Sequence, residues 1–174
     1  MTQAHKSRAR RALATLAVLA VSATGAVARM LEAPEGEVIL TVSGNVQATN
    51  ATGKAEFDLA MLEALPVTEF TTSTIWTEGT HTYTGVALET FLDAVAAEGT
   101  RLEAMAINDY SVEIPISDAI EGGPILAYKV DGAPMSRREK GPIWLIYPYD
   151  QSVDYRSETI YTRSIWQLDR LHVE

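Results

Sequence analysis

The sequence predicts an α+β fold, in which mixed β-sheets and a few short helices form a single domain. Residues 59–65 and 87–97 carry the two main helix signals, and Ser117 is a candidate cap for a single helical turn. The first 28 of the 174 residues are interpreted as an export signal, and the remaining 146 suit one ordinary domain. Runs rich in β-branched and aromatic residues, bounded by turn residues, predict strands at 38–46, 71–76, 102–107, 110–116, 125–130 and 143–147.

Residues 1–28 have the layout of a cleavable export signal, and residues 29–37 form a short linker to the domain at 38–174. The signal has an apolar segment at 12–21 and ends in Ala26-Val27-Ala28, which is typical of cleavage after Ala28. The apolar segment is shorter than the roughly 20 residues that span a bilayer, so no stable membrane anchor is expected after cleavage. The protein is therefore expected to be periplasmic or secreted.

The basic start of the signal contains Lys6, Arg8, Arg10 and Arg11. The pair Arg10-Arg11 loosely matches a twin-arginine signal, which exports folded proteins, and the general route for unfolded chains remains the alternative. The whole chain has 14 basic and 23 acidic residues. Cleavage of the signal removes these four basic residues and leaves 10 basic and 23 acidic residues, a net charge of −13. Nucleic acid and anionic membrane surfaces are excluded as partners on this ground.

The chain contains no cysteine. An exported domain without cysteine has no disulfide framework and depends on its hydrophobic core. The absence of thiols also removes the ligand that soft metals prefer.

Two helices are expected in the first half of the domain. Asp58 is expected to cap the helix over 59–65, and Pro66 ends it. Leucine, phenylalanine and valine recur at helical spacing in 87–97, and Gly99 terminates that segment. Both helices are interpreted as core-packing elements.

Residues 70–86 lie between these helices and are rich in hydroxyl and aromatic side chains. We expect a strand over 71–76, a turn at Glu78-Gly79-Thr80, and then residues 83–86 leading into the second helix. A strand, a loop and a helix N-terminus commonly present N–H groups and side chains to a ligand. The alternative is a threonine-rich strand followed by a surface loop.

The second half of the domain is expected to be mainly β. Residues 102–107 and 110–116 predict a hairpin joined at Asn108-Asp109. A charged loop at 136–140 holds the densest basic cluster, and residues 164–173 alternate as a strand does.

Three blocks of the sequence resemble successive blocks of the molybdopterin-binding domain of the sulfite oxidase family. They are NDYSVEIP at 108–115, AYKVDGAPM at 127–135 and KGPIWLIYP at 140–148. YTGVAL at 83–88 and the segment 163–168 resemble two further blocks. The resemblance extends from about residue 38 to the C-terminus. It implies a sulfite-oxidase-type molybdopterin-binding fold in a small stand-alone domain.

The resemblance does not carry over the metal ligand. Catalytic members of this family hold molybdenum through a cysteine in a Cys-x-x-x-Trp context, and matching Trp76 to that tryptophan puts Thr72 at the cysteine position. A threonine hydroxyl is a hard, weakly acidic group and a poor substitute for a thiolate. We therefore expect no cofactor and no metal ligand. A metal-free pterin-type ligand and a molybdenum cofactor held without a thiolate remain the alternatives.

A ligand site is expected in the crevice between residues 72–81 and the loop 136–140. The ligand would be bound by hydroxyl groups, aromatic faces, one imidazole and positively charged side chains at the rim. These groups belong to Thr71, Thr72, Ser73, Trp76, His81, Tyr110, Arg137 and Arg138. Each also has a structural alternative, as a core aromatic, an exposed histidine or a solvated arginine.

Two functions from different classes are consistent with this sequence. The first is an exported non-redox module that binds a small anionic or pterin-like ligand, or a periplasmic protein partner. The second is a molybdopterin-dependent oxidoreductase with an unusual cysteine-free site. Ligand chemistry favours the first.

Overall fold

The computed structural model describes residue 1 and residues 31–174. The interpreted export signal and the start of the linker lie outside the described residues. One five-stranded sheet has the order β2-β1-β10-β5-β6. Its strands are β1 (Leu40–Gly44), β2 (Lys54–Phe57), β5 (Arg101–Ala106), β6 (Ser111–Pro115) and β10 (Leu168–Val173). The β1–β10 pair is parallel and the others are antiparallel, so this sheet is mixed.

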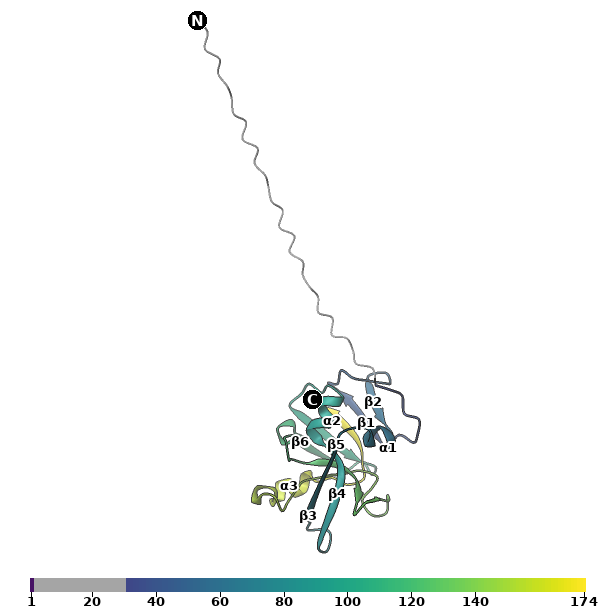
Figure 1. Cartoon of the computed structure of the whole chain (residues 1–174), viewed down its shortest axis with the longest axis vertical. Helices are drawn as coiled ribbons and strands as arrows, with labels where there is room; N and C mark the ends of the chain where they lie inside the picture. The colour runs from purple at the N-terminus through teal and green to yellow at the C-terminus, as the bar shows by residue number, and fades with distance from the viewer. Residues whose placement is uncertain (2–30) are drawn as a thin grey trace.

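The second sheet has the order β3-β4-β7-β8, with β9 also paired to β7. Its strands are β3 (Val67–Ser73), β4 (Thr80–Ala87), β7 (Ile125–Val130), β8 (Ala133–Pro134) and β9 (Trp144–Ile146). All of its pairs are antiparallel. Figure 1 shows the β3–β4 hairpin at the opposite end of the domain from β1 and β2.

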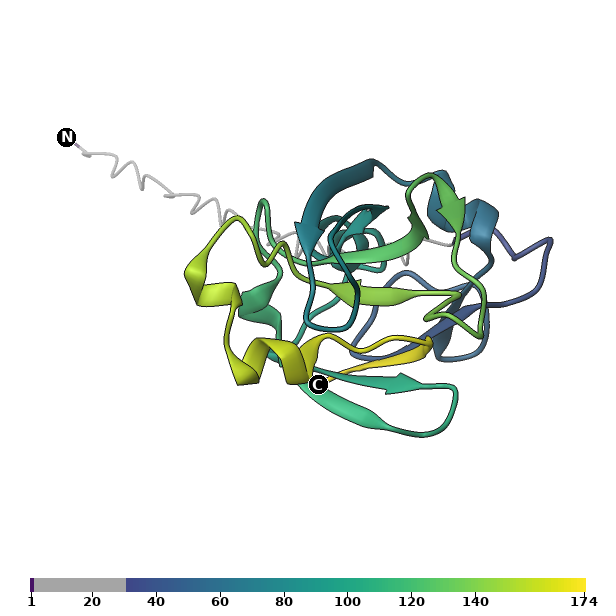
Figure 2. The same ribbon diagram turned by 90° about the horizontal axis from the view of Figure 1, so that it is seen from below.

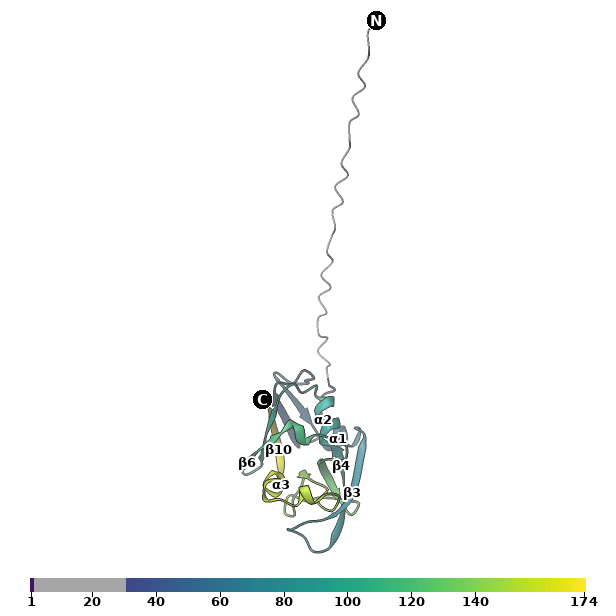
Figure 3. The ribbon, with the colours of Figure 1, turned by 90° about the vertical axis from the view of Figure 1, so that its left-hand side faces the viewer.

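Three short α-helices accompany the sheets. They are α1 (Leu59–Glu63), α2 (Leu88–Ala94) and α3 (Glu158–Arg163), with single 3-10 turns η1 (Ile116–Asp118) and η2 (Val153–Tyr155). Helices α1 and α2 both pack against β4 and lie close together in Figure 3. Figure 2 shows α3 beside β10 and the β5–β6 hairpin. None of the helices in residues 31–174 combines the length and the apolar character needed to cross a lipid bilayer.

The buried side chains of both sheets join one hydrophobic core. Phe57 of β2 packs against Phe91 of α2, with ring centroids 5.1 Å apart. Asp58 caps α1 as expected, accepting the N–H of Met61 at 2.9 Å. Its other oxygen accepts the N–H of Glu35 and of Gly36, which holds the segment before β1 against the domain. The predicted α+β class, with mixed sheets, few short helices and one domain, is confirmed.

Strand β4 corrects our interpretation of residues 70–86. The segment is a β-hairpin, because β4 pairs with β3 from Val67 opposite Val86 to Ser73 opposite Thr80. The turn begins at residue 74, earlier than expected, because the Thr74 hydroxyl accepts the N–H of Trp76 at 3.0 Å. A threonine side chain that binds nearby backbone competes with the strand ladder in this way.

Three further elements differ from the expectation. Strand β2 is unexpected, because its alternation of Lys54 and Glu56 with two buried residues is only four residues long. Helix α3 is also unexpected, because six residues are too few to establish helical periodicity. The final strand starts at Leu168 rather than at residue 164, since Gln167 adopts a φ of 53° that interrupts extended backbone.

Candidate functional site

Thr72 lies at the end of β3 and is completely buried. Its hydroxyl donates to the carbonyl oxygen of Ser73 at 3.2 Å and accepts the N–H of Asp150 at 3.0 Å. Both functions of the hydroxyl are therefore occupied by backbone groups. The residue that the resemblance aligns with a metal-binding cysteine acts here as a structural link.

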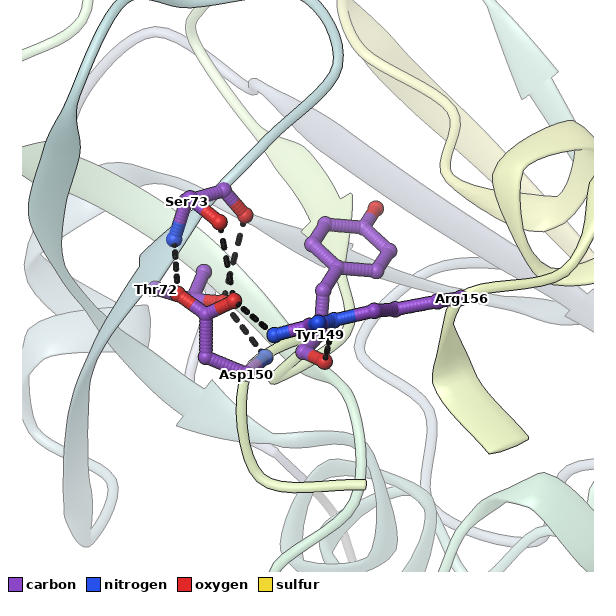
Figure 4. A network of polar contacts seen from close by, with 5 residues as sticks. All are labelled: Thr72, Ser73, Tyr149, Asp150 and Arg156. Atoms are coloured by element: carbon purple, nitrogen blue, oxygen red, sulfur yellow. Dashed lines mark hydrogen bonds and ion pairs between the residues drawn. The ribbon is translucent and has the colours of Figure 1, made fainter. Parts of the chain in front are cut away.

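Asp150 completes this link from the loop that follows β9. Its carboxylate accepts the N–H of Ser73 at 2.6 Å and the Ser73 hydroxyl at 2.8 Å, and it pairs with Arg156 at 2.6 Å. Figure 4 shows these groups converging on the carboxylate. The pKa of Asp150 lies below its usual value, because three groups stabilise the charged carboxylate. The largest effect comes from the Ser73 N–H, followed by the Ser73 hydroxyl and Arg156. We call Thr72, Ser73, Asp150 and Arg156 the Asp150 clasp.

Three tryptophans pack together beside the clasp. Trp76 of the hairpin turn lies 5.8 Å from Trp144 and 5.6 Å from Trp166, measured between ring centroids. Edge-to-face packing of this kind is favourable beyond the area it buries. The cluster connects the turn, β9 and the segment before β10.

A cleft of about 600 Å³ opens on one side of this cluster. Four aromatic residues line it, namely Trp76, Tyr110, Tyr161 and Trp166. Its size and its mostly apolar walls are those of a small-molecule site. Ile75, which is 62% exposed, also lines the cleft.

The polar groups of the cleft come from the β5–β6 turn, from α3 and from the segment between α3 and β10. Asn108, Glu158 and Gln167 are among them. The Gln167 amide donates to the carbonyl oxygen of Arg137 at 2.5 Å, which leaves its oxygen for another partner. These groups offer both donors and acceptors, and Glu158 adds one negative charge.

Of the eight expected site residues, Trp76 and Tyr110 line the cleft. Thr72 and Ser73 belong to the Asp150 clasp. Thr71 bonds across the hairpin to Thr82, hydroxyl to hydroxyl at 2.9 Å. His81, Arg137 and Arg138 also lie outside the cleft lining.

The two arginines of the basic loop lie outside the cleft lining. Arg137 pairs with Glu37 at 2.7 Å, and Arg138 is exposed. The ammonium nitrogen of Lys140 lies 4.2 Å from the ring centroid of Trp166 and 5.1 Å from that of Trp144. Burial against these rings lowers the pKa of Lys140.

His81 is tied to the turn after β7. Its Nδ1 lies 2.7 Å from the carboxylate of Asp131, and its Nε2 lies 2.9 Å from the carbonyl oxygen of Glu78. The bond to Asp131 raises the pKa of His81. The stabilisation is fully present below the unfolded-state pKa of about 6.5 and is lost as pH rises through the folded-state pKa.

We expect Asp131→Asn to lower the pKa of His81 toward about 6.5, because the amide carries no charge to stabilise the imidazolium. An NMR titration of the His81 ring measures this shift. The parent protein, titrated under the same conditions, is the reference. An unchanged His81 titration would contradict the role assigned to Asp131.

The cleft contains residues that the sequence interpretation did not select. Glu158 and Tyr161 lie on α3, and Trp166 lies in the segment between α3 and β10. Ser157, which accepts the N–H of Ile160 as the cap of α3, is the signal that could have located this helix.

Comparison with known proteins gives one family. A family model described as oxidoreductase molybdopterin binding domain matches residues 34–153. None of the curated proteins matches the chain. The matched range ends before α3, so one wall of the cleft lies beyond it.

Proposed function

The chain belongs to the oxidoreductase molybdopterin binding domain family, and from this premise we propose that it is an exported, non-redox ligand-binding module. In this proposal Thr72, which stands at the position of the family's metal-binding cysteine, stabilises the fold and binds no metal. The cleft beside the tryptophan cluster is the binding site.

The donor set does not fit the molybdenum cofactor that the family implies. The chain has no cysteine, and both functions of the Thr72 hydroxyl are bound to backbone. No group of three or more metal-ligating side chains occurs among residues 31–174. A soft metal prefers thiolate to a hydroxyl that is already hydrogen-bonded, so we derive no redox step for this chain.

The single observation that carries the proposal is the burial of Thr72 within the Asp150 clasp. A ligand to an exchangeable cofactor needs a free lone pair that faces the cofactor. Thr72 instead has no exposed surface and joins β3 to the loop at Asp150. The nearby aromatic cleft supports a retained binding role.

Elemental analysis for molybdenum tests the proposal, on protein purified from its native exporting host. We expect molybdenum at background. A cysteine-containing member of the family, purified from the same host, is the positive control for cofactor supply. Molybdenum near one atom per chain would overturn the proposal and establish a cysteine-free oxidoreductase.

Export is part of the same proposal, with cleavage after Ala28. We expect the exported protein to begin at Arg29, which intact-mass measurement checks.

Changing both Arg10 and Arg11 to lysine keeps the basic charge of the signal and removes the twin-arginine pair. We expect secretion to continue, and its loss would indicate export of an already folded protein.

A further inference from the structure

The aromatic walls of the cleft stand nearly perpendicular to one another. The ring of Trp76 meets that of Tyr161 at 84° and that of Trp166 at 72°, with centroids 5.7 and 5.6 Å apart. All three rings line the cleft. Because these rings are in edge-to-face contact, they form one continuous wall whose ring faces point in different directions. Aromatic faces of this kind attract alkylated ammonium groups.

The charge of the cleft has the matching sign. Lys, Arg and His are absent from its described lining, which includes one carboxylate, that of Glu158. Glu158 is exposed, and the described part of the chain offers it no ion-pair partner. The domain as a whole is strongly acidic. An anion entering this cleft would meet the Glu158 carboxylate, whereas the ammonium group of Lys140 lies outside the lining, against Trp166.

The protein itself shows that this cluster accommodates an ammonium group. The Lys140 nitrogen, which lies outside the cleft lining, sits 4.2 Å from the centroid of Trp166. That distance is within the range of cation–π attraction. No carboxylate in the described residues pairs with Lys140, so the aromatic rings are its main favourable contact.

We propose that the cleft binds a small organic cation of the alkylated ammonium class. The ammonium group packs against the aromatic wall of Trp76, Tyr161 and Trp166, and Glu158 supplies the counter-charge. This inference rests on the proposed ligand-binding function and names its ligand class. It reverses the sign of the anionic ligand expected from the sequence, because that expectation placed Arg137 and Arg138 at the site.

The test compares choline with dimethylbutanol, its uncharged isostere in which carbon replaces the nitrogen. Each is titrated into the exported protein, with binding followed by tryptophan fluorescence and by calorimetry. Because the two ligands have nearly the same shape, the difference in their affinities measures the effect of charge. We expect choline to bind about tenfold more tightly.

Two glutamate variants locate the counter-charge. Glu158→Gln is expected to weaken choline binding roughly threefold and to leave dimethylbutanol binding unchanged, as suits an exposed ion pair. Glu89→Gln is the matched control. Glu89 is likewise an exposed glutamate in the first turn of a short helix, and it does not line the cleft. It is expected to change neither affinity.

Equal affinities for choline and dimethylbutanol, absence of choline binding, or tighter binding of inorganic phosphate would each overturn this inference. Molybdenum analysis of the same preparation separates that failure from failure of the proposed function. If molybdenum is at background and choline does not bind, the proposed ligand class is wrong and the proposed non-redox function stands. Stoichiometric molybdenum removes the function from which the ligand class was inferred.

Discussion

Replacing Gly85 with alanine is expected to destabilise the protein by about 3 kcal/mol or more, the upper range for overpacked sites. Gly85 lies in β4, and a Cβ built on it would stand 2.1 Å from the Leu126 carbonyl oxygen and 2.7 Å from the Ala127 Cα of β7. These are backbone atoms of a paired strand, so no side-chain rotation relieves the overlap. The two strands must separate where their register shifts, between Thr84 and Gly85.

Urea unfolding monitored by circular dichroism measures this loss. Gly53→Ala is the control, because Gly53 has a φ of 69° and a methyl group at this position would meet no other atom within 4 Å. That variant isolates the cost of a left-handed backbone, about 1–2 kcal/mol. A Gly85 variant that loses no more than the Gly53 variant would show that β4 and β7 separate easily.

The Gly85 position also shows what the sequence could and could not predict. The block YTGVAL was one of five blocks whose order suggested the family, and the family was right. The block leads into a helix as expected, since α2 begins at Leu88, but the sequence did not indicate that residues 83–87 belong to β4. The close approach of Leu126 that requires glycine arises from pairing between strands distant in sequence, which local sequence does not encode.

The candidate site was predictable where a residue's role follows from its own chemistry. Trp76 and Tyr110 were selected as aromatic faces, and both line the cleft. The roles of Arg137 and Thr72 depend on partners distant in sequence. Arg137 pairs with Glu37, and Thr72 binds the backbone of Asp150. Neither partner could be identified from composition or spacing.

Replacing Asp150 with alanine is expected to cost about 2–3 kcal/mol of unfolding free energy. The carboxylate accepts two hydrogen bonds from Ser73 and pairs with Arg156, and each bond to a charged acceptor contributes about 1.5–3 kcal/mol. The sum is reduced because the Asp150 and Arg156 side chains are 30% and 51% exposed and solvent screens the pair. In the variant the bond from the N–H of residue 150 to the Thr72 hydroxyl remains as a link between this loop and β3.

Two companion variants make this result specific to the clasp. Asp154→Ala removes an exposed carboxylate from the same loop, whose described partner is the Ser152 hydroxyl at 3.4 Å, and is expected to change stability little. Asp150→Asn keeps an acceptor oxygen but not the charge, so its loss should lie between the other two. Equal losses for Asp150→Ala and Asp154→Ala would contradict the clasp.

The pH dependence of the unfolding free energy distinguishes the contribution of the Asp150 charge from that of its packing. Because its pKa is lowered in the folded protein, its stabilisation is complete above the unfolded-state pKa of about 3.9 and is lost as pH falls through the folded-state value. The difference in unfolding free energy between the parent protein and Asp150→Ala should therefore be constant from pH 7 to about pH 5 and shrink in more acidic solution. A difference that stayed constant at acidic pH would mean that the carboxylate acts only through packing. Thr72 and Ser73 would then be held by the loop backbone alone, since the Thr72 hydroxyl binds the N–H of residue 150 whatever its side chain.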